Sequence, residues 1–183
     1  MRQAYLVYGC EGSGTRLLTR ILIEAGARGD HGHGQKFDQG LPHADSIDGT
    51  IVWRRSWPHA QRTPDIPAMV TAMRQAGWSP YALVIVRDTV PNVRAQVPAH
   101  AKTIDAAWQK NQEMFAAMFS GLYRVKVPYD VLTYEGLVAR PYDLQDYIGT
   151  LPGLHTPQPY VEVTDANTKH WAAWRTDHPV PVE

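Results

Sequence analysis

Two patterns of apolar and polar residues recur along the chain, and each predicts one type of secondary structure. Short apolar segments, typical of buried strands in a parallel sheet, occur at Ala4–Tyr8, Thr50–Trp53, Ala82–Val86 and Tyr123–Val127. Apolar residues at helical spacing occur at Leu17–Ala25, Asp65–Ala76, Ile104–Phe119 and Leu144–Leu151. Because strands alternate with helices, we expect βαβ units in a three-layer α/β/α domain with a mostly parallel sheet and helices on both sides.

The third predicted helix has the clearest inner face. Its core-facing residues are expected to be Trp108, Asn111, Phe115, Met118 and Leu122. Two other segments lack any apolar periodicity. Residues 29–50 contain five glycines and three histidines, which predicts a mobile or functional insert. Residues 156–183 are rich in proline and predict an irregular C-terminal segment of one domain spanning residues 1–183.

Composition and charge narrow the class of protein. Of the 183 residues, 44% are apolar and 20% are charged, as in ordinary globular chains. The 18 Lys and Arg residues balance 18 Asp and Glu residues, which argues against a protein that coats nucleic acid or an anionic membrane. Cys10 is the single cysteine, and no apolar run suits a signal peptide or a membrane span. We therefore expect a cytoplasmic protein without nucleic-acid or membrane partners.

A glycine-rich segment, Gly9–Arg16, joins the first predicted strand to the first predicted helix. The free backbone N–H groups and the dipole at the start of a helix attract anions, and glycine lets the backbone approach them closely. Ser13 and Thr15 add hydroxyl donors, and Arg16 adds a positive charge. Arginine supplies 13 of the 18 basic residues, which favours phosphate or sulfate recognition unless codon usage alone causes the bias. The segment predicts an anion-binding loop, with a tight turn that binds nothing as the alternative.

The loop does not match the nucleoside triphosphatase pattern G-x-x-x-x-G-K-[ST] in full. Gly9 and Gly14 have the required spacing, but Thr15 occupies the place of the lysine and Arg16 that of the magnesium-binding hydroxyl. The phosphate clamp and the metal ligand are both missing from the pattern. Hydrolysis of ATP or GTP is therefore poorly supported.

Three segments instead resemble the sulfotransferase family. They are Ser13-Gly14-Thr15-Arg16 before an apolar helix, the strand that ends in Arg87-Asp88, and Val127–Leu132. The resemblance implies a P-loop-type fold and a metal-independent transfer of a sulfuryl group from 3′-phosphoadenosine 5′-phosphosulfate (PAPS) to a hydroxyl or amine acceptor. Adenosine 3′,5′-bisphosphate would be the product. The cofactor-binding residues implied are Gly12, Ser13, Gly14, Thr15, Arg16, Arg87, Arg94 and Lys169.

The chain departs from the family pattern at functional positions. Gly12 stands where the family carries a basic residue that neutralises the bridging oxygen of the donor, and Arg16 is a candidate replacement. Ala95 stands where the family places a serine partner for Arg87, with Arg94 beside it. Lys169, in Asn167-Thr168-Lys169-His170, is the nearest candidate for the family's basic C-terminal contact with the 3′-phosphate.

A general base must accept the proton of the attacking acceptor. The family often has a histidine after its second strand, and His59 occupies a similar place, two positions further on. Arg54 and Arg55 precede it and must face opposite sides of a strand, so one of them is expected to approach the anion. His31, His33 and His43 do not form a known zinc pattern, and we predict no metal site.

Two other functions stay open from the residues alone. A phosphate-loop kinase of a nucleotide or small molecule is suggested by the Gly9–Gly14 spacing and by Asp88, which follows a strand. A nucleotide-binding module that has lost catalysis is suggested by Gly12, where the family has a cation.

Overall fold

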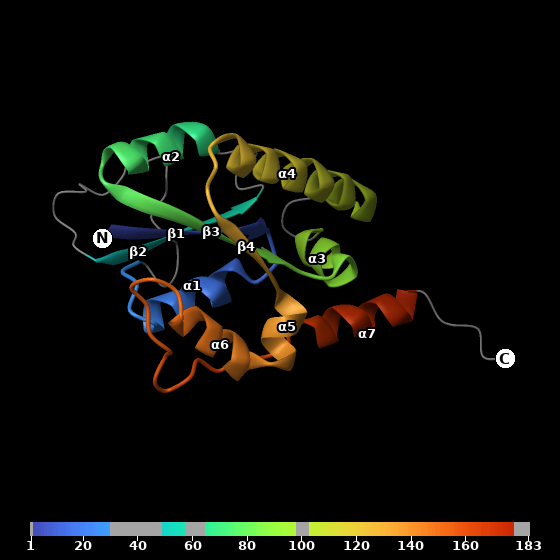
Figure 1. The fold of residues 1–183 in the computed structure, drawn as a ribbon. Coiled ribbons are helices and arrows are strands. Elements are labelled where there is room, and N and C mark those ends of the chain that lie inside the picture. The colour runs from blue at the N-terminus through green and yellow to red at the C-terminus, as the bar shows by residue number, and fades with distance from the viewer. Residues whose placement is uncertain (1, 30–48, 58–64, 98–102, 178–183) are drawn as a thin grey trace.

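The computed structural model of the chain describes residues 2–29, 49–57, 65–97 and 103–177 (Figure 1). These residues form an all-parallel, four-stranded sheet with the order β2-β1-β3-β4. The strands are β1 (Arg2–Cys10), β2 (Thr50–Trp57), β3 (Trp78–Val86) and β4 (Tyr129–Thr133). The helices are α1 (Thr15–Glu24), α2 (Ile66–Gln75), α3 (Thr89–Gln96), α4 (Ile104–Arg124), α5 (Tyr134–Ala139), α6 (Pro141–Gly149) and α7 (Asn167–Asp177).

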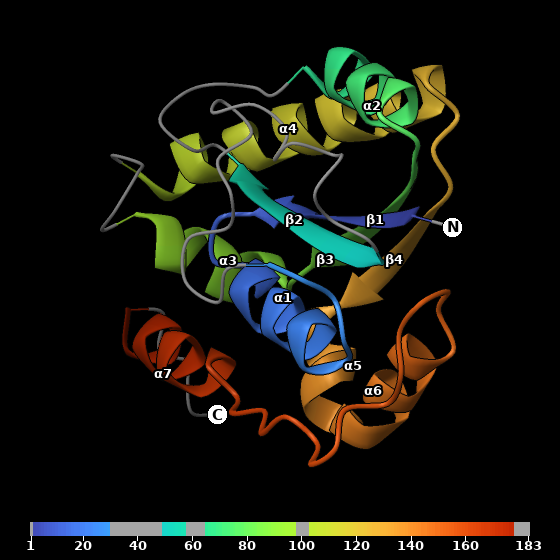
Figure 2. The ribbon, with the colours of Figure 1, turned by 90° about the vertical axis from the view of Figure 1, so that its left-hand side faces the viewer.

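Helices cover both faces of the sheet (Figures 1 and 2). On one face, α2 and α4 bury Val70 and Met118 against Leu6 of β1. On the other face, α1 and α6 bury Leu18 and Ile148 against the opposite side of the same strands. The expected α/β class, with a parallel sheet between two layers of helices, is confirmed for the described residues.

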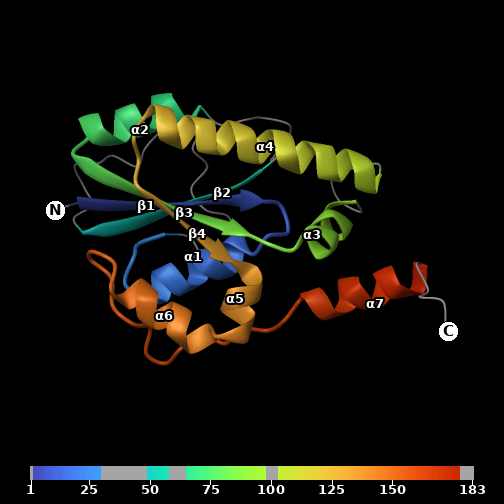
Figure 3. The same cartoon turned by 45° about the vertical axis from the view of Figure 1, so that its right-hand side comes forward.

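The sheet brings together the segments that follow its strands. In parallel strands the carboxyl ends lie at one edge, where ligands of α/β proteins bind. Figure 3 shows α3 and α7 beyond this edge, next to the ends of β1 and β3. The glycine-rich loop between β1 and α1 therefore lies close to Arg87 and α3. Gly12 and Arg87 are 75 residues apart in the sequence, and Glu11 and Asn92 are 81 residues apart.

The sequence pattern placed the fourth strand wrongly. Tyr123–Val127 covers the end of α4 and the turn after it, and the strand is instead β4, Tyr129–Thr133. The helix continues to Arg124 because Leu122 is fully buried on its inner side. β4 lies at the edge of the sheet and buries only Leu132, so it lacks the continuous apolar run that identifies β1 and β3.

Two further expectations were wrong. The C-terminal segment predicted to be irregular contains α7. The polar and aromatic residues of α7 form no apolar stripe, so the helical periodicity that would predict a helix is weak there. Trp108 was expected in the core but is 47% exposed. The first turns of α4 lie next to α3 rather than over the sheet, as Figure 3 shows, so Trp108 does not reach the central core. No helix among the described residues has the length and apolar character needed to cross a bilayer.

Candidate anion-binding site

The loop between β1 and α1 depends on glycine for its shape. Gly12 and Gly14 have φ values of +78° and +98°, in the left-handed region that other residues rarely adopt. Gly14 is the N-cap of α1, and a Cβ atom there would lie 2.7 Å from Cδ2 of Tyr134. A side chain at Gly9 would collide with the Ser13 hydroxyl and the Ile85 carbonyl. Steric constraints therefore explain the glycines that the sequence pattern linked to anion binding.

A buried amide network holds the first carbonyl of the loop. Asn92 and Gln96 of α3 each donate to the Glu11 carbonyl oxygen, from Nδ2 and Nε2 respectively, at 2.9 Å. Asn111 of α4 completes the network by donating to Asn92 Oδ1 at 2.7 Å and accepting from Gln96 Nε2 at 2.9 Å. All three amides are buried, with exposures of 2–7%. The network fixes the Glu11 carbonyl toward α3.

Arg87, at the end of β3, holds the next carbonyl. Its Nη1 donates to the Gly12 oxygen at 2.6 Å, and its Nε donates to Oδ1 of Asn167 at 2.5 Å. The guanidinium also lies 4.6 Å from the centre of the Tyr134 ring. Burial lowers the pKa of Arg87, although nearby groups such as Glu135 oppose that change. Arg87 therefore connects the loop to the start of α7.

Asn167 is itself fixed in place. It is 7% exposed, and its Nδ2 donates to Oε1 of Glu135 at 2.7 Å. The same carboxylate oxygen accepts from the backbone N–H of Asp88 at 3.1 Å. The hydroxyl of Tyr134 donates to the Thr164 carbonyl and accepts from the Ala166 N–H, which anchors the chain just before α7. The sequence motif contained Asn167, but only the fold shows that it orients Arg87.

Two further carbonyls of the loop are also occupied within the protein. The Cys10 oxygen accepts from the Ser13 N–H at 3.0 Å, and the Gly14 oxygen accepts from the Leu18 N–H at 3.1 Å. By contrast, the first N–H groups of any α-helix have no acceptor within that helix. The carbonyl oxygens of Cys10, Glu11, Gly12 and Gly14 are thus engaged, and the loop offers mainly donors at the start of α1.

Two buried donors in this region have no hydrogen-bond partner within the part of the chain that the structure describes. They are Oγ of Ser13, a residue that is 1% exposed, and Nη2 of Arg87. A buried polar group without a partner is unfavourable by about 1–3 kcal/mol, so such groups are rare in folded proteins. Ser13 Oγ can donate or accept a hydrogen bond and Arg87 Nη2 can only donate, so a group that accepts from both would satisfy them. An oxyanion has that chemistry.

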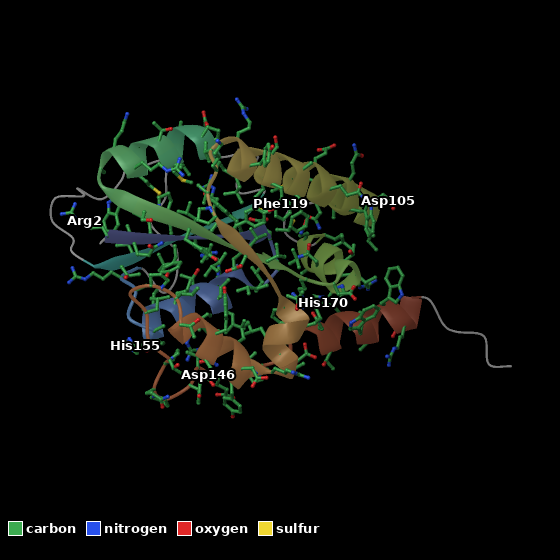
Figure 4. The ribbon with its side chains drawn as sticks, in the orientation of Figure 1. Arg2, Asp105, Phe119, Asp146, His155 and His170 are labelled. Atoms are coloured by element: carbon green, nitrogen blue, oxygen red, sulfur yellow. The ribbon has the colours of Figure 1, made fainter. Side chains whose placement is uncertain are left out.

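Other basic side chains lie beside Arg87 where α3 and α7 pack. Arg94 of α3 lies 5.9 Å from the centre of the Trp174 ring on α7. Burial lowers the pKa of His170, and the positive charges of Arg87, Lys169 and Arg94 lower it further. We call Arg87, Arg94, Lys169 and His170 the basic cluster. Figure 4 shows His170 on α7, on the side of the molecule that carries α3 and far from Arg2 and His155.

The basic cluster contains three of the predicted cofactor-binding residues, Arg87, Arg94 and Lys169, which the fold brings to one end of the sheet. Gly12, Ser13, Gly14 and Thr15 form the adjoining loop, as expected. Arg16, also predicted to bind the cofactor, lies exposed on the first turn of α1. His59, the predicted base, lies outside the described residues, as do His31, His33 and His43.

A chain of hydroxyl groups reaches the loop from β2. Thr15 Oγ1 and Ser56 Oγ are 2.6 Å apart, and Nη1 of Arg54 donates to the Ser56 oxygen at 3.3 Å. Arg55 points to the opposite side of β2, where it is 7% exposed and near Tyr8. Of the two arginines, Arg54 is therefore the one on the side of the loop. Sequence reasoning named this pair of arginines but missed the role of Ser56.

Other reactive groups near the loop do not suggest additional chemistry. Burial, with a further contribution from Glu11, raises the pKa of the Cys10 thiol to about 12, so it is protonated at neutral pH. Among the described residues, no group of three His, Cys, Asp or Glu side chains is placed to hold a metal ion. A scan against models of known protein families matches none of them, and a comparison with curated proteins finds no similar sequence.

Proposed function

We propose that this protein binds the sulfuryl donor PAPS at the loop and the basic cluster, and transfers the sulfuryl group to a hydroxyl or amine acceptor. The observation that carries the proposal is the pair of buried donors without acceptors, Ser13 Oγ and Arg87 Nη2. They belong to two regions of one site, the loop and the end of β3. PAPS carries a phosphosulfate group and a 3′-phosphate, and so offers an anionic group to each region.

The two regions of the site would bind different ends of PAPS. The N–H groups at the start of α1, with Ser13 and Thr15, would take the phosphosulfate end. Arg87, with Arg94 and Lys169, would take the 3′-phosphate, as the resemblance to sulfotransferases in these segments implies. The proposed P-loop type of fold rests on the same resemblance and on the loop that joins β1 to α1.

The proposed reaction needs no metal. The acceptor oxygen or nitrogen forms a bond to sulfur while the bond between sulfur and the bridging phosphate oxygen breaks, and that oxygen keeps the electron pair. A base takes the proton of the acceptor, and adenosine 3′,5′-bisphosphate leaves. His59 is the base suggested by the sequence. The donors of the loop offset the negative charge that develops on the leaving phosphate.

Two other functions compete with this proposal. A phosphate-loop kinase would need a lysine at the position of Thr15, and the Thr15 hydroxyl is instead bonded to Ser56. A binding module without catalysis would keep the same loop and basic cluster. Only the first alternative should require magnesium, and only the second should bind PAPS without any transfer.

Binding measured by calorimetry distinguishes these functions. Adenosine 3′,5′-bisphosphate should bind without metal, and more tightly than adenosine 5′-monophosphate, which lacks the 3′-phosphate. Arg94→Ala should weaken bisphosphate binding about 10-fold or more, since a hydrogen bond to a charged group is worth about 1.5–3 kcal/mol. Arg140→Ala is the control, because Arg140 is 80% exposed and forms a surface ion pair with Asp143. Binding of ATP with magnesium, and not of the bisphosphate, would refute the proposal in favour of a kinase.

A further inference from the structure

The loop lacks a positive charge at Gly12, and the structure contains two arginines that are candidates to replace it. Arg16 is near in sequence, but its side chain is exposed. Arg54 is half-buried at the end of β2, on the side of the loop, and is joined to the loop by hydrogen bonds through Ser56 and Thr15. Ser56 is the register partner of Gly9, where the loop begins. We call Arg54, Ser56 and Thr15 the hydroxyl chain.

The direction of donation along the hydroxyl chain follows from the chemistry of its members. A guanidinium only donates, so the Ser56 oxygen accepts from Arg54. Ser56 can then donate its own hydrogen to Thr15 Oγ1, which leaves the Thr15 hydrogen for an acceptor at the loop. An anion bound at the start of α1 selects this direction, because it attracts the Thr15 hydrogen. Hydrogen bonds in such a chain strengthen one another, most of all when one end is charged.

The burial of Thr15 makes this arrangement effective. Thr15 is 3% exposed, so its hydroxyl is shielded from water that would otherwise weaken the interaction. Thr15 is also the first residue of α1, where backbone N–H groups have no acceptor in the helix. Its hydroxyl therefore reinforces the donors at the same helix terminus.

We propose that Arg54, acting through Ser56 and Thr15, is the positioning residue that supplies the positive charge missing at Gly12. The inference rests on the proposed function, since it requires an anion at the loop. When the bond between sulfur and the bridging oxygen breaks, the electron pair stays on that oxygen. The Thr15 hydroxyl, polarised by Arg54, donates a hydrogen bond toward this charge without transferring its proton. Arg54 touches neither the sulfur nor the acceptor.

The test uses two ligands that differ at one end. Adenosine 3′,5′-bisphosphate places a phosphate at the loop, and adenosine 3′-monophosphate does not. Ser56→Ala should weaken binding of the bisphosphate about 10-fold and leave binding of the 3′-monophosphate unchanged, because the chain acts only on the 5′ end. A residue with a merely structural role would weaken both ligands. Ser56→Thr, which keeps the hydroxyl, should bind the bisphosphate as the unmodified protein does.

Arg54 is tested in the same way. Arg54→Gln should reproduce the selective loss, and the Arg54→Gln/Ser56→Ala double variant should lose little more than either single variant, because the chain acts as one unit. Arg140→Ala, an exposed variant outside the site, is the control and should bind both ligands normally; Arg16→Ala is measured beside it because Arg16 is the competing candidate for the missing charge. If Ser56→Ala does not fold, Arg54→Gln provides the same comparison of ligands.

The outcomes separate this inference from the proposed function. If the unmodified protein does not bind the bisphosphate, both are refuted. If it binds, but Ser56→Ala and Arg54→Gln bind equally well, only the hydroxyl chain is refuted. A selective loss in Arg16→Ala with normal binding in Arg54→Gln would assign the missing charge to Arg16 instead.

Discussion

Replacing Arg87 tests whether one side chain both braces the loop and binds the ligand. Arg87→Ala removes the hydrogen bonds to the Gly12 carbonyl and to Asn167, and the contact with the Tyr134 ring. It also removes the buried Nη2 that has no partner. The variant should therefore lose stability without any ligand, and should lose affinity for the bisphosphate as well.

The magnitude of the stability loss follows from these contacts. Two hydrogen bonds from a charged donor contribute about 1.5–3 kcal/mol each, and the cation–π contact adds about 0.5–1 kcal/mol. Loss of the unsatisfied Nη2 is favourable by about 1–3 kcal/mol and offsets part of this. Half-burial of Arg87 places each contribution near its lower limit. We expect a net loss of about 2–4 kcal/mol, which for a chain of this size lowers the melting temperature by about 4–16 °C.

Urea unfolding of Arg87→Ala, Asn167→Ala and the double variant measures the effect and its cause. The coupling energy between Arg87 and Asn167 should be about 1–2 kcal/mol, because their side chains share one charged hydrogen bond. Arg140→Ala, a surface variant, should change stability by less than about 0.5 kcal/mol. Unchanged stability in Arg87→Ala, or no coupling to Asn167, would refute the bracing role.

Three other perturbations test separate parts of the structure. Gly14→Ala should destabilise the protein by at least about 2 kcal/mol more in urea unfolding than Gly49→Ala, because both have similar positive φ values but only a Cβ at Gly14 meets Tyr134. The pKa of His170 is lower in the folded protein than in the unfolded chain, so the unfolded chain takes up the His170 proton first, near pH 6.5. The free energy of unfolding should therefore fall as the pH decreases from 8 to 5. His170→Gln should flatten this dependence, and an unaltered pH profile would contradict it. Burial and the hydrogen bond to Asp130 raise the pKa of Tyr81 to about 12, so Asp130→Asn should lower the pKa of Tyr81 in a spectroscopic titration, and an unchanged value would argue against the contact.

The elements that could be predicted from the sequence are those marked by a pattern of neighbouring residues. The run Ala82–Val86 is apolar because β3 is covered on both faces, and the glycines around Ser13 follow from the turn that joins β1 to α1. β4 could not be placed because an edge strand buries little. α7 could not be predicted because it is held by contacts of Arg87 with Asn167 and of Arg94 with Trp174 rather than by an apolar stripe.

The contacts that shape the site join residues that are far apart in sequence. Gly12 and Arg87 are separated by 75 positions, and Arg87 and Asn167 by 80. A lone asparagine or serine, such as Asn92 or Ser56, has no sequence signal that distinguishes a bond to the loop from exposure on the surface. The sulfotransferase resemblance and the roles of His59 and Lys169 stay predictions.

The amide network explains why polar residues occupy a place where apolar ones would pack. Asn92, Gln96 and Asn111 are buried, and burial of amides adds little net stability even when every group is bonded. Their effect is instead to fix the Glu11 carbonyl, which would repel an anion if it turned toward the site. Arg87 does the same for the Gly12 carbonyl. Folding alone thus fixes both carbonyls, so an anion at the loop would bind with little rearrangement.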